Sequence, residues 1–122
     1  MTWDVGSIKE DRYVSFTDVI WNETQFIAAG TSRLGRPCGL IATSIDGTDW
    51  IIKRVENSFG FNCIAWDGSK YCCDILYTSK DTDTWENLNQ TAMNDFCSII
   101  WNGKMFVAVV LDSFSMIPLR MA

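Results

Sequence analysis

Residues 98–110 have the sequence SIIWNGKMFVAVV, in which an apolar run ends at Trp101 and an aromatic residue follows five positions later. The Asn-Gly pair between them tolerates the positive φ angles of a tight hairpin turn. Residues 18–30 (DVIWNETQFIAAG) and residues 63–73 (CIAWDGSKYCC) repeat this arrangement around Trp21 and Trp66. Three copies of one hairpin predict a repeat protein built from antiparallel strands.

A second motif alternates with the hairpins. Residues 44–50 (SIDGTDW) match residues 79–85 (SKDTDTW) position by position, and each copy stands at the same distance before the next hairpin tryptophan. Trp3 keeps a similar register before Trp21. The tryptophans therefore fall into two alternating classes, which scattered core residues would not do.

Each full repeat contains four short candidate strands, and no segment has a sustained helical period. The expected strands are Val14–Trp21, Gln25–Thr31, Leu40–Ser44 and Trp50–Val55, then Phe61–Trp66, Lys70–Cys73, Ile75–Ser79 and Trp85–Leu88, and finally Cys97–Trp101, Lys104–Leu111 and Ser115–Leu119. The first repeat has extra residues at 30–39, and their Gly, Pro and Ser content predicts a loop. Four antiparallel strands in roughly 40 residues are typical of a β-propeller blade.

The second motif resembles the Asp-box, or BNR repeat, of sialidases and of many non-enzymatic propellers, whose pattern is Ser-x-Asp-x-Gly-x-x-Trp. The first copy is one residue shorter, and Thr82 replaces the glycine of the second. The resemblance implies a propeller fold and a structural role for the box residues. These are Ser44, Asp46, Gly47, Trp50, Ser79, Asp81 and Trp85. Independently of it, a short carboxylate at a tight turn is suited to accept backbone N–H bonds.

We expect a single all-β domain over residues 1–122, with about three four-stranded blades at 13–55, 61–88 and 96–122 and a stray outer strand at 2–6. Propellers have about four to eight blades, so this ring is incomplete. Oligomerisation or partner chains would complete it, and the strand at Trp3 would fit the last blade of an adjacent chain. A fragment of a longer propeller protein is the other alternative.

The amino-acid composition argues against several classes of function. The chain has a net charge of −5 and no histidine, which argues against nucleic-acid binding and removes the commonest general base. No apolar run is long enough for a membrane helix, and no signal peptide is visible. Five cysteines without a Cys-x-x-Cys pair favour free buried thiols and no metal site. We expect no cofactor, and a cytoplasmic location or one within a virion.

The expected function is therefore a non-enzymatic structural or protein-interaction subunit, for example of a virus or phage particle. The alternative is an oligomeric carbohydrate-binding lectin, in which Arg33 and Arg36 would pair with a carboxylate or an anionic sugar and Phe59 would stack on the ring. Phe61 is a second aromatic candidate. A sialidase-like glycoside hydrolase fragment is less favoured, because no spacing marks a catalytic carboxylate pair. Calcium binding at the boxes is disfavoured because the turns are short.

Overall fold

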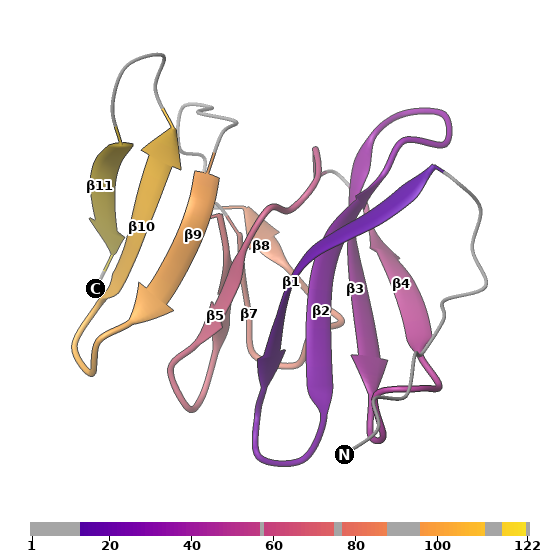
Figure 1. The fold of residues 1–122 in the computed structure, drawn as a ribbon, viewed down its shortest axis with the longest axis horizontal. Coiled ribbons are helices and arrows are strands. Elements are labelled where there is room, and N and C mark those ends of the chain that lie inside the picture. The colour runs from indigo at the N-terminus through magenta and orange to yellow at the C-terminus, as the bar shows by residue number, and fades with distance from the viewer. Residues whose placement is uncertain (1–12, 57, 75–76, 88–95, 112–115, 122) are drawn as a thin grey trace, which may run out of the picture.

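The computed structural model describes residues 13–56, 58–74, 77–87, 96–111 and 116–121, and it contains strands and turns but no helix within these ranges (Figure 1). The strands are β1 (Val14–Trp21), β2 (Phe26–Ser32), β3 (Cys38–Ser44), β4 (Ile51–Val55), β5 (Ile64–Trp66), β6 (Tyr71–Cys73), β7 (Tyr77–Ser79), β8 (Glu86–Asn87), β9 (Phe96–Trp101), β10 (Phe106–Leu111) and β11 (Met116–Met121). The predicted all-β class is confirmed. The expected strand at residues 2–6, with Trp3, lies outside the described residues.

The strands form three antiparallel sheets that follow one another along the chain. Sheet I has the order β1-β2-β3-β4, sheet II the order β5-β6-β7-β8 and sheet III the order β9-β10-β11. The first strand of each sheet lies next to the first strand of the following sheet, because β1 contacts β5 and β5 contacts β9. Figure 1 shows the three sheets side by side, with sheet II between the other two. No sheet closes on itself among the described strands.

Two apolar cores join the sheets. The core between sheets I and II contains Ile27, Ala29, Ile41, Val55, Phe61, Ile64, Tyr71, Cys73 and Tyr77. The core between sheets II and III contains Cys63, Ala65, Cys72, Ile99, Phe106 and Ala108. Successive residues of a strand point to opposite faces, so the alternating residues of β5 and β6 contribute to both cores. Sheet II is therefore the middle layer of a stack.

The three predicted hairpins are present and share one turn design. Asn22, Asp67 and Asn102 each use a side-chain oxygen to accept N–H bonds from the residues two and three positions later, at 2.8–3.0 Å. Gly68 and Gly103 have φ angles of 101° and 99°, as the sequence predicted. In each hairpin the tryptophan pairs with the aromatic residue five positions later, and the ring centroids are 4.8, 6.1 and 5.0 Å apart.

The strand of sheet II that was expected to begin at Phe61 begins at Ile64 instead. The N–H of Phe61 donates to the carbonyl of Gly30 in sheet I, at 3.1 Å. The N–H groups of Asn62 and Cys63 donate to the carboxylate of Asp74, at 3.0 Å each. Because these donors have partners outside the strand ladder, pairing with β6 does not extend to them. Both ends of β1 are confirmed, and the other described strand ends either agree with the expected ones or differ by one or two residues.

Candidate functional site

The first Asp-box is a closed network of local hydrogen bonds after β3. The carboxylate of Asp46 accepts bonds from the N–H groups of Thr48 and Asp49, at 2.9 and 3.0 Å, and from the hydroxyl of Ser44 at 3.1 Å. The same hydroxyl accepts the N–H of Gly47 at 2.8 Å. The indole N–H of Trp50 donates to the carbonyl of Gly47 at 3.2 Å. These bonds hold the pKa of Asp46 below its ordinary value.

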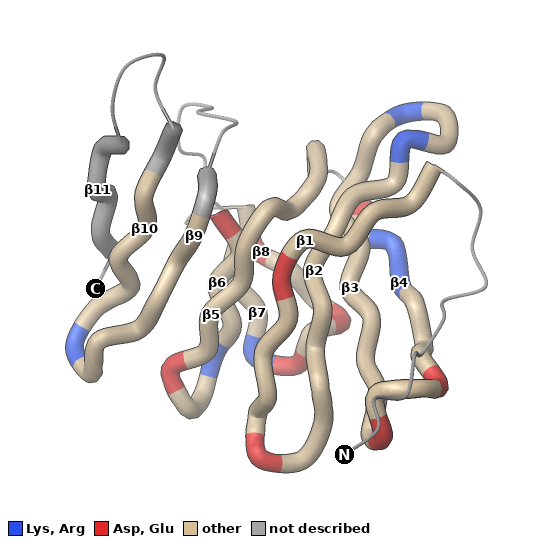
Figure 2. Tube along the Cα trace, in the orientation of Figure 1, with Lys and Arg blue, Asp and Glu red and all other residues tan. Residues whose placement is uncertain are grey.

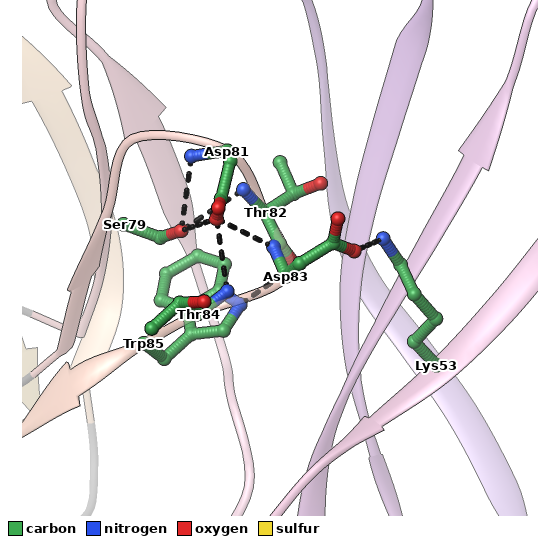
Figure 3. Close-up of polar contacts among 7 residues, drawn as sticks. All are labelled: Lys53, Ser79, Asp81, Thr82, Asp83, Thr84 and Trp85. Carbon is green, nitrogen blue, oxygen red and sulfur yellow. Dashed lines mark hydrogen bonds and ion pairs between the residues drawn. The ribbon is translucent and has the colours of Figure 1, made fainter.

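The second box repeats this network after β7, as Figure 3 shows. Asp81 accepts the N–H groups of the residues two and three positions later, both at 2.9 Å, and the hydroxyl of Ser79 at 3.1 Å. Ser79 accepts the N–H of Thr82 at 2.9 Å, and the indole of Trp85 donates to the carbonyl of Thr82, also at 2.9 Å. Thr82 has a φ angle of 67°, so a threonine occupies the left-handed position that Gly47 fills at 82° in the first box.

The second box also contacts sheet I. Asp83, in the turn, forms an ion pair with Lys53 of β4 (Figure 3). The ring of Trp85 lies 5.5 Å from the ring of Phe61 and packs against the core between sheets I and II. The box residues thus stabilise turns and contact the neighbouring sheet. No group of three or more His, Cys, Asp or Glu side chains in the described part of the chain is arranged to hold a metal ion.

A pocket of about 290 Å³ lies at the other end of sheet I, near the β2–β3 loop. Its lining consists of Arg36, Pro37, Cys38, Arg54, Glu56, Ser58 and Phe59. Figure 2 shows basic positions in this loop and on β4, whereas the acidic positions of the first box turn lie at the opposite end of the sheet. Two of the three predicted ligand-binding residues, Arg36 and Phe59, therefore meet in one pocket. Arg33 is exposed and is not among its lining residues.

The floor of this pocket is anchored by hydrogen bonds. The hydroxyl of Ser58 donates to the carbonyl of Val55 at 2.5 Å and accepts the N–H of Gly39 at 2.7 Å. The guanidinium of Arg54 donates to Ser32 at 3.2 Å and lies 3.9 Å from the carboxylate of Glu56. Arg54 was not predicted as a site residue, since it lies in no recognisable motif. Its position follows from strand register, which places it opposite Leu40 of β3.

The pocket is lined by the guanidinium of Arg36 and the exposed ring of Phe59, and the hydrogen bonds of Ser58 hold the nearby backbone. Phe59 is 69% exposed, whereas Phe61, the other aromatic candidate, is fully buried in the core. No described residue forms an ion pair with Arg36, and Arg36 is exposed. A guanidinium pairs with carboxylates in a bidentate manner, and an aromatic face stacks on a sugar ring. The arrangement therefore suits a small ligand that carries a carboxylate.

The described cysteines do not form a nucleophilic site. Cys38, Cys63, Cys72 and Cys73 are free and buried, as the sequence predicted, while the side chain of Cys97 lies outside the described residues. Burial raises the pKa of the Cys63 and Cys73 thiols, and the nearby carboxylate of Asp74 raises both further. Since the thiolate is the reactive form, these groups have the properties of structural cysteines.

The face of sheet I that points away from sheet II is a second candidate site. We call the face of each sheet that carries the hairpin tryptophan its leading face, and the opposite face its trailing face. Val19 on the leading face of sheet I is 52% exposed, whereas the equivalent Ile64 and Ile99 of sheets II and III are 1% and 5% exposed. A cavity of about 550 Å³ on this side of sheet I is lined by Phe16, Thr17, Asp18, Val19, Ala28, Gly47 and Trp50.

In comparisons with protein-family models, curated proteins and solved structures, nothing matches this chain. No helix in the described residues has the length and apolar character needed to cross a membrane. The two candidate sites are therefore the pocket near the β2–β3 loop and the leading face of sheet I.

Proposed function

We propose that the protein is a non-enzymatic, self-associating subunit whose three sheets are consecutive blades of an open, propeller-like arc. Two observations support the blade interpretation. The sheets are antiparallel meanders in chain order, and their first strands are neighbours along β1, β5 and β9. Stacked sheets joined through their faces leave one apolar face at each end of the stack, and exposed apolar faces of this kind mark interaction surfaces.

The exposure of Val19 is the observation that carries this proposal. The repeat contains the same apolar position three times, and the second and third copies are buried by the preceding sheet. Only the first copy has no preceding sheet among the described residues. The side chain of Val19 is therefore apolar, like those at the buried equivalent positions, but it is exposed to solvent.

The test of the proposed function is the native mass of the protein, measured by light scattering coupled to size exclusion over a range of concentrations. We expect a mass that is a multiple of the chain mass of 13.8 kDa. A single species at the chain mass, even at high micromolar concentration, would contradict self-association.

A second candidate function is recognition of an acidic sugar or another small carboxylate, because Arg36 and Phe59 meet in one pocket. Calorimetry with sialic acid, after a glycan array, would test it. We expect saturable binding that Arg36→Ala weakens by about tenfold or more, since a charge-assisted hydrogen bond contributes about 1.5–3 kcal/mol. Arg33→Ala is the matched control, since Arg33 lies in the same loop but outside the pocket lining. Equal loss in both variants would contradict a role for this pocket.

A further inference from the structure

The chain contains two examples of the same sheet-to-sheet interface. In the first, Ile27 and Ala29 on the trailing face of sheet I meet Ile64 and Cys73 on the leading face of sheet II. In the second, the equivalent trailing position Cys72 of sheet II meets Ile99 on the leading face of sheet III. The rule that a trailing face meets a leading face is thus observed twice in one molecule.

The residues that line the cavity on sheet I correspond to residues that a trailing face covers in the first interface. Phe16, Val19, Ala28 and Trp50 line it, and they stand at the repeat positions of four residues of sheet II. Those four residues are Phe61, Ile64, Cys73 and Trp85, and all of them belong to the core between sheets I and II or pack against it. In sheet II the set is covered by the trailing face of sheet I. In sheet I the same set borders a cavity of about 550 Å³, where Val19 is 52% exposed and the small side chain of Ala28 is 5% exposed.

The trailing face of sheet III also exposes an apolar residue whose equivalent in sheet II is buried. Ile100 is 59% exposed, although its equivalent in sheet II, Ala65, is 5% exposed and belongs to the second core. Val107 is directly opposite Ile100, and Val109 lies two residues further along β10 on the same face. Both valines are only partly buried. These three side chains are aliphatic, as are Ile27 and Ala29 at the equivalent positions of sheet I, and the exposed Ser98 lies opposite Val109.

We propose that the trailing face of sheet III in a second copy of the chain docks on the leading face of sheet I. This inference depends on the proposed self-association and identifies its two surfaces. The contact places Ile100 and Val107 of one copy against the cavity beside Val19 of the other. Asp18 is the acidic residue in the cavity lining, and its carboxylate accepts the N–H groups of Val19 and Ile64, at 2.9 and 3.0 Å, so the contact does not bury a carboxylate without hydrogen bonds.

The residues at the hairpin ends of the interfaces are also compatible with the proposed contact. In the first interface the amide of Asn22 donates to the hydroxyl of Tyr71, at 2.7 Å. In the second interface the residue at the position of Tyr71 is Phe106, which has no hydroxyl, and Phe106 is nevertheless fully buried. Sheet I has Phe26 at this position, so it matches the second interface, which forms without that bond. The proposed contact therefore requires no polar partner that the chain lacks.

The two docking surfaces are different, so the contact is heterologous and joins copies head to tail. This property allows a test by complementation. Val19→Glu disables the leading face of sheet I and leaves the trailing face of sheet III intact. Ile100→Glu does the reverse. We expect each variant alone to have the mass of one chain in light scattering, and a mixture of the two to form a one-to-one complex through the remaining intact pair of faces.

Ile45→Glu is the matched control, since Ile45 is 80% exposed and does not line the cavity on the leading face of sheet I. It is expected to keep the wild-type mass. Val19→Ala and Ile100→Ala are milder variants that cannot bury a charge. Each is expected to raise the dissociation concentration by about tenfold, from the loss of buried methyl groups. Circular dichroism would establish that every variant keeps its strand content.

The outcomes separate the two levels of the proposal. A wild-type protein of single-chain mass overturns the proposed function itself. A wild-type oligomer whose mass survives both glutamate substitutions overturns only this choice of surfaces. Self-association of Ile100→Glu alone would indicate contact between two leading faces, and variants that do not combine when mixed would indicate a different partner. Each of these last two results overturns the head-to-tail contact.

Discussion

Sheets I and II contain the same hairpin and the same box turn, but equivalent residues of the two sheets differ in burial because different surfaces pack against them. The hydrogen bonds of the two boxes agree within 0.3 Å, although one turn has Gly47 and the other Thr82 at the left-handed position. In contrast, Val19 is 52% exposed while Ile64 at the equivalent position is 1% exposed. The comparison teaches that the local turns are set by short-range hydrogen bonding, whereas burial is set by what stacks on each sheet.

A second difference concerns the residue three positions after the hairpin aromatic. Sheet I has Ala29 there, and sheet II has Asp74, which is 4% exposed. The carboxylate of Asp74 accepts the N–H groups of Asn62 and Cys63 and the thiol of Cys63 at 3.2 Å. Sheet II therefore depends on a buried acid at a position where sheet I has a small apolar residue.

The largest expected difference between the repeats is in side-chain truncation. Ile64→Ala should lower the free energy of unfolding by about 2–5 kcal/mol, because it opens a cavity between sheets I and II. Val19→Ala should change that free energy by less than about 0.5 kcal/mol in dilute, monomeric protein, because its side chain is exposed there. Urea denaturation monitored by tryptophan fluorescence would measure both. Equal losses would mean that Val19 is buried within a single chain.

The next largest effect is a pH dependence of the free energy of unfolding that arises from Asp74, for which sheet I has no equivalent acid. The pKa of Asp74 is raised from 3.8 to about 6, because burial and, to a smaller degree, the nearby Asp18 carboxylate outweigh the hydrogen bonds from Cys63 and Asn62 that lower it. A pKa that is higher in the folded state contributes stability below pH about 4, and this contribution is lost as the pH rises through about 6. The change is about 3 kcal/mol.

Asp74→Asn removes this titration, so the stability of the wild type relative to the variant should fall between pH 4 and pH 7. Denaturant titrations of both proteins at several pH values would measure the difference. A constant difference would show that folding does not change the pKa of Asp74, and the opposite slope would show that folding lowers it; either result contradicts the expected shift.

A smaller effect is expected at the acidic residue of each box. Asp46→Ala and Asp81→Ala should each lower the free energy of unfolding and the melting temperature, because each removes a carboxylate that accepts two N–H bonds. The pKa of both carboxylates is lowered, so this stabilisation should be lost as the pH falls.

The matched control for the boxes is Asp49→Ala, an exposed carboxylate in the same turn for which no side-chain bond to a described residue is present. Its melting temperature should stay near that of the wild type. Unchanged melting temperatures for Asp46→Ala and Asp81→Ala as well would show that the boxes do not anchor their turns.

The smallest effect tests the residue at the left-handed position of the turns, which is Gly47 in the first box and Thr82 in the second. Gly47→Thr places a β-branched residue at a φ angle of 82°, which should cost about 1 kcal/mol. A Cβ atom at Gly47 would lie 3.6 Å from the Phe26 ring, an ordinary contact, so the cost is conformational. Gly47→Asn should cost less, because asparagine tolerates the left-handed region. Calorimetry would rank the two, and a larger loss for asparagine would contradict the strain explanation.

Much of the fold could be predicted from short-range signals. The alternating tryptophans located the hairpins and boxes, and the serine and aspartate of each box were correctly expected to bond the turn backbone. The start of β5 could not be predicted, because it depends on Asp74 and on the carbonyl of Gly30 in another sheet. The pocket was predicted only in part, since Arg54 reaches it through the pairing of β4 with β3.

The sequence by itself determined the antiparallel strands, the hairpin turns and the box turns, because these depend on hydrogen bonds between residues a few positions apart and on residue types that tolerate positive φ angles. Only the tertiary structure decided which copies of one repeated position are buried. Val19, Ile64 and Ile99 are nearly the same residue in the same local setting, and their exposure differs because two of them have a sheet stacked on them. Burial is a property of the neighbouring surface, and that surface lies far away along the chain.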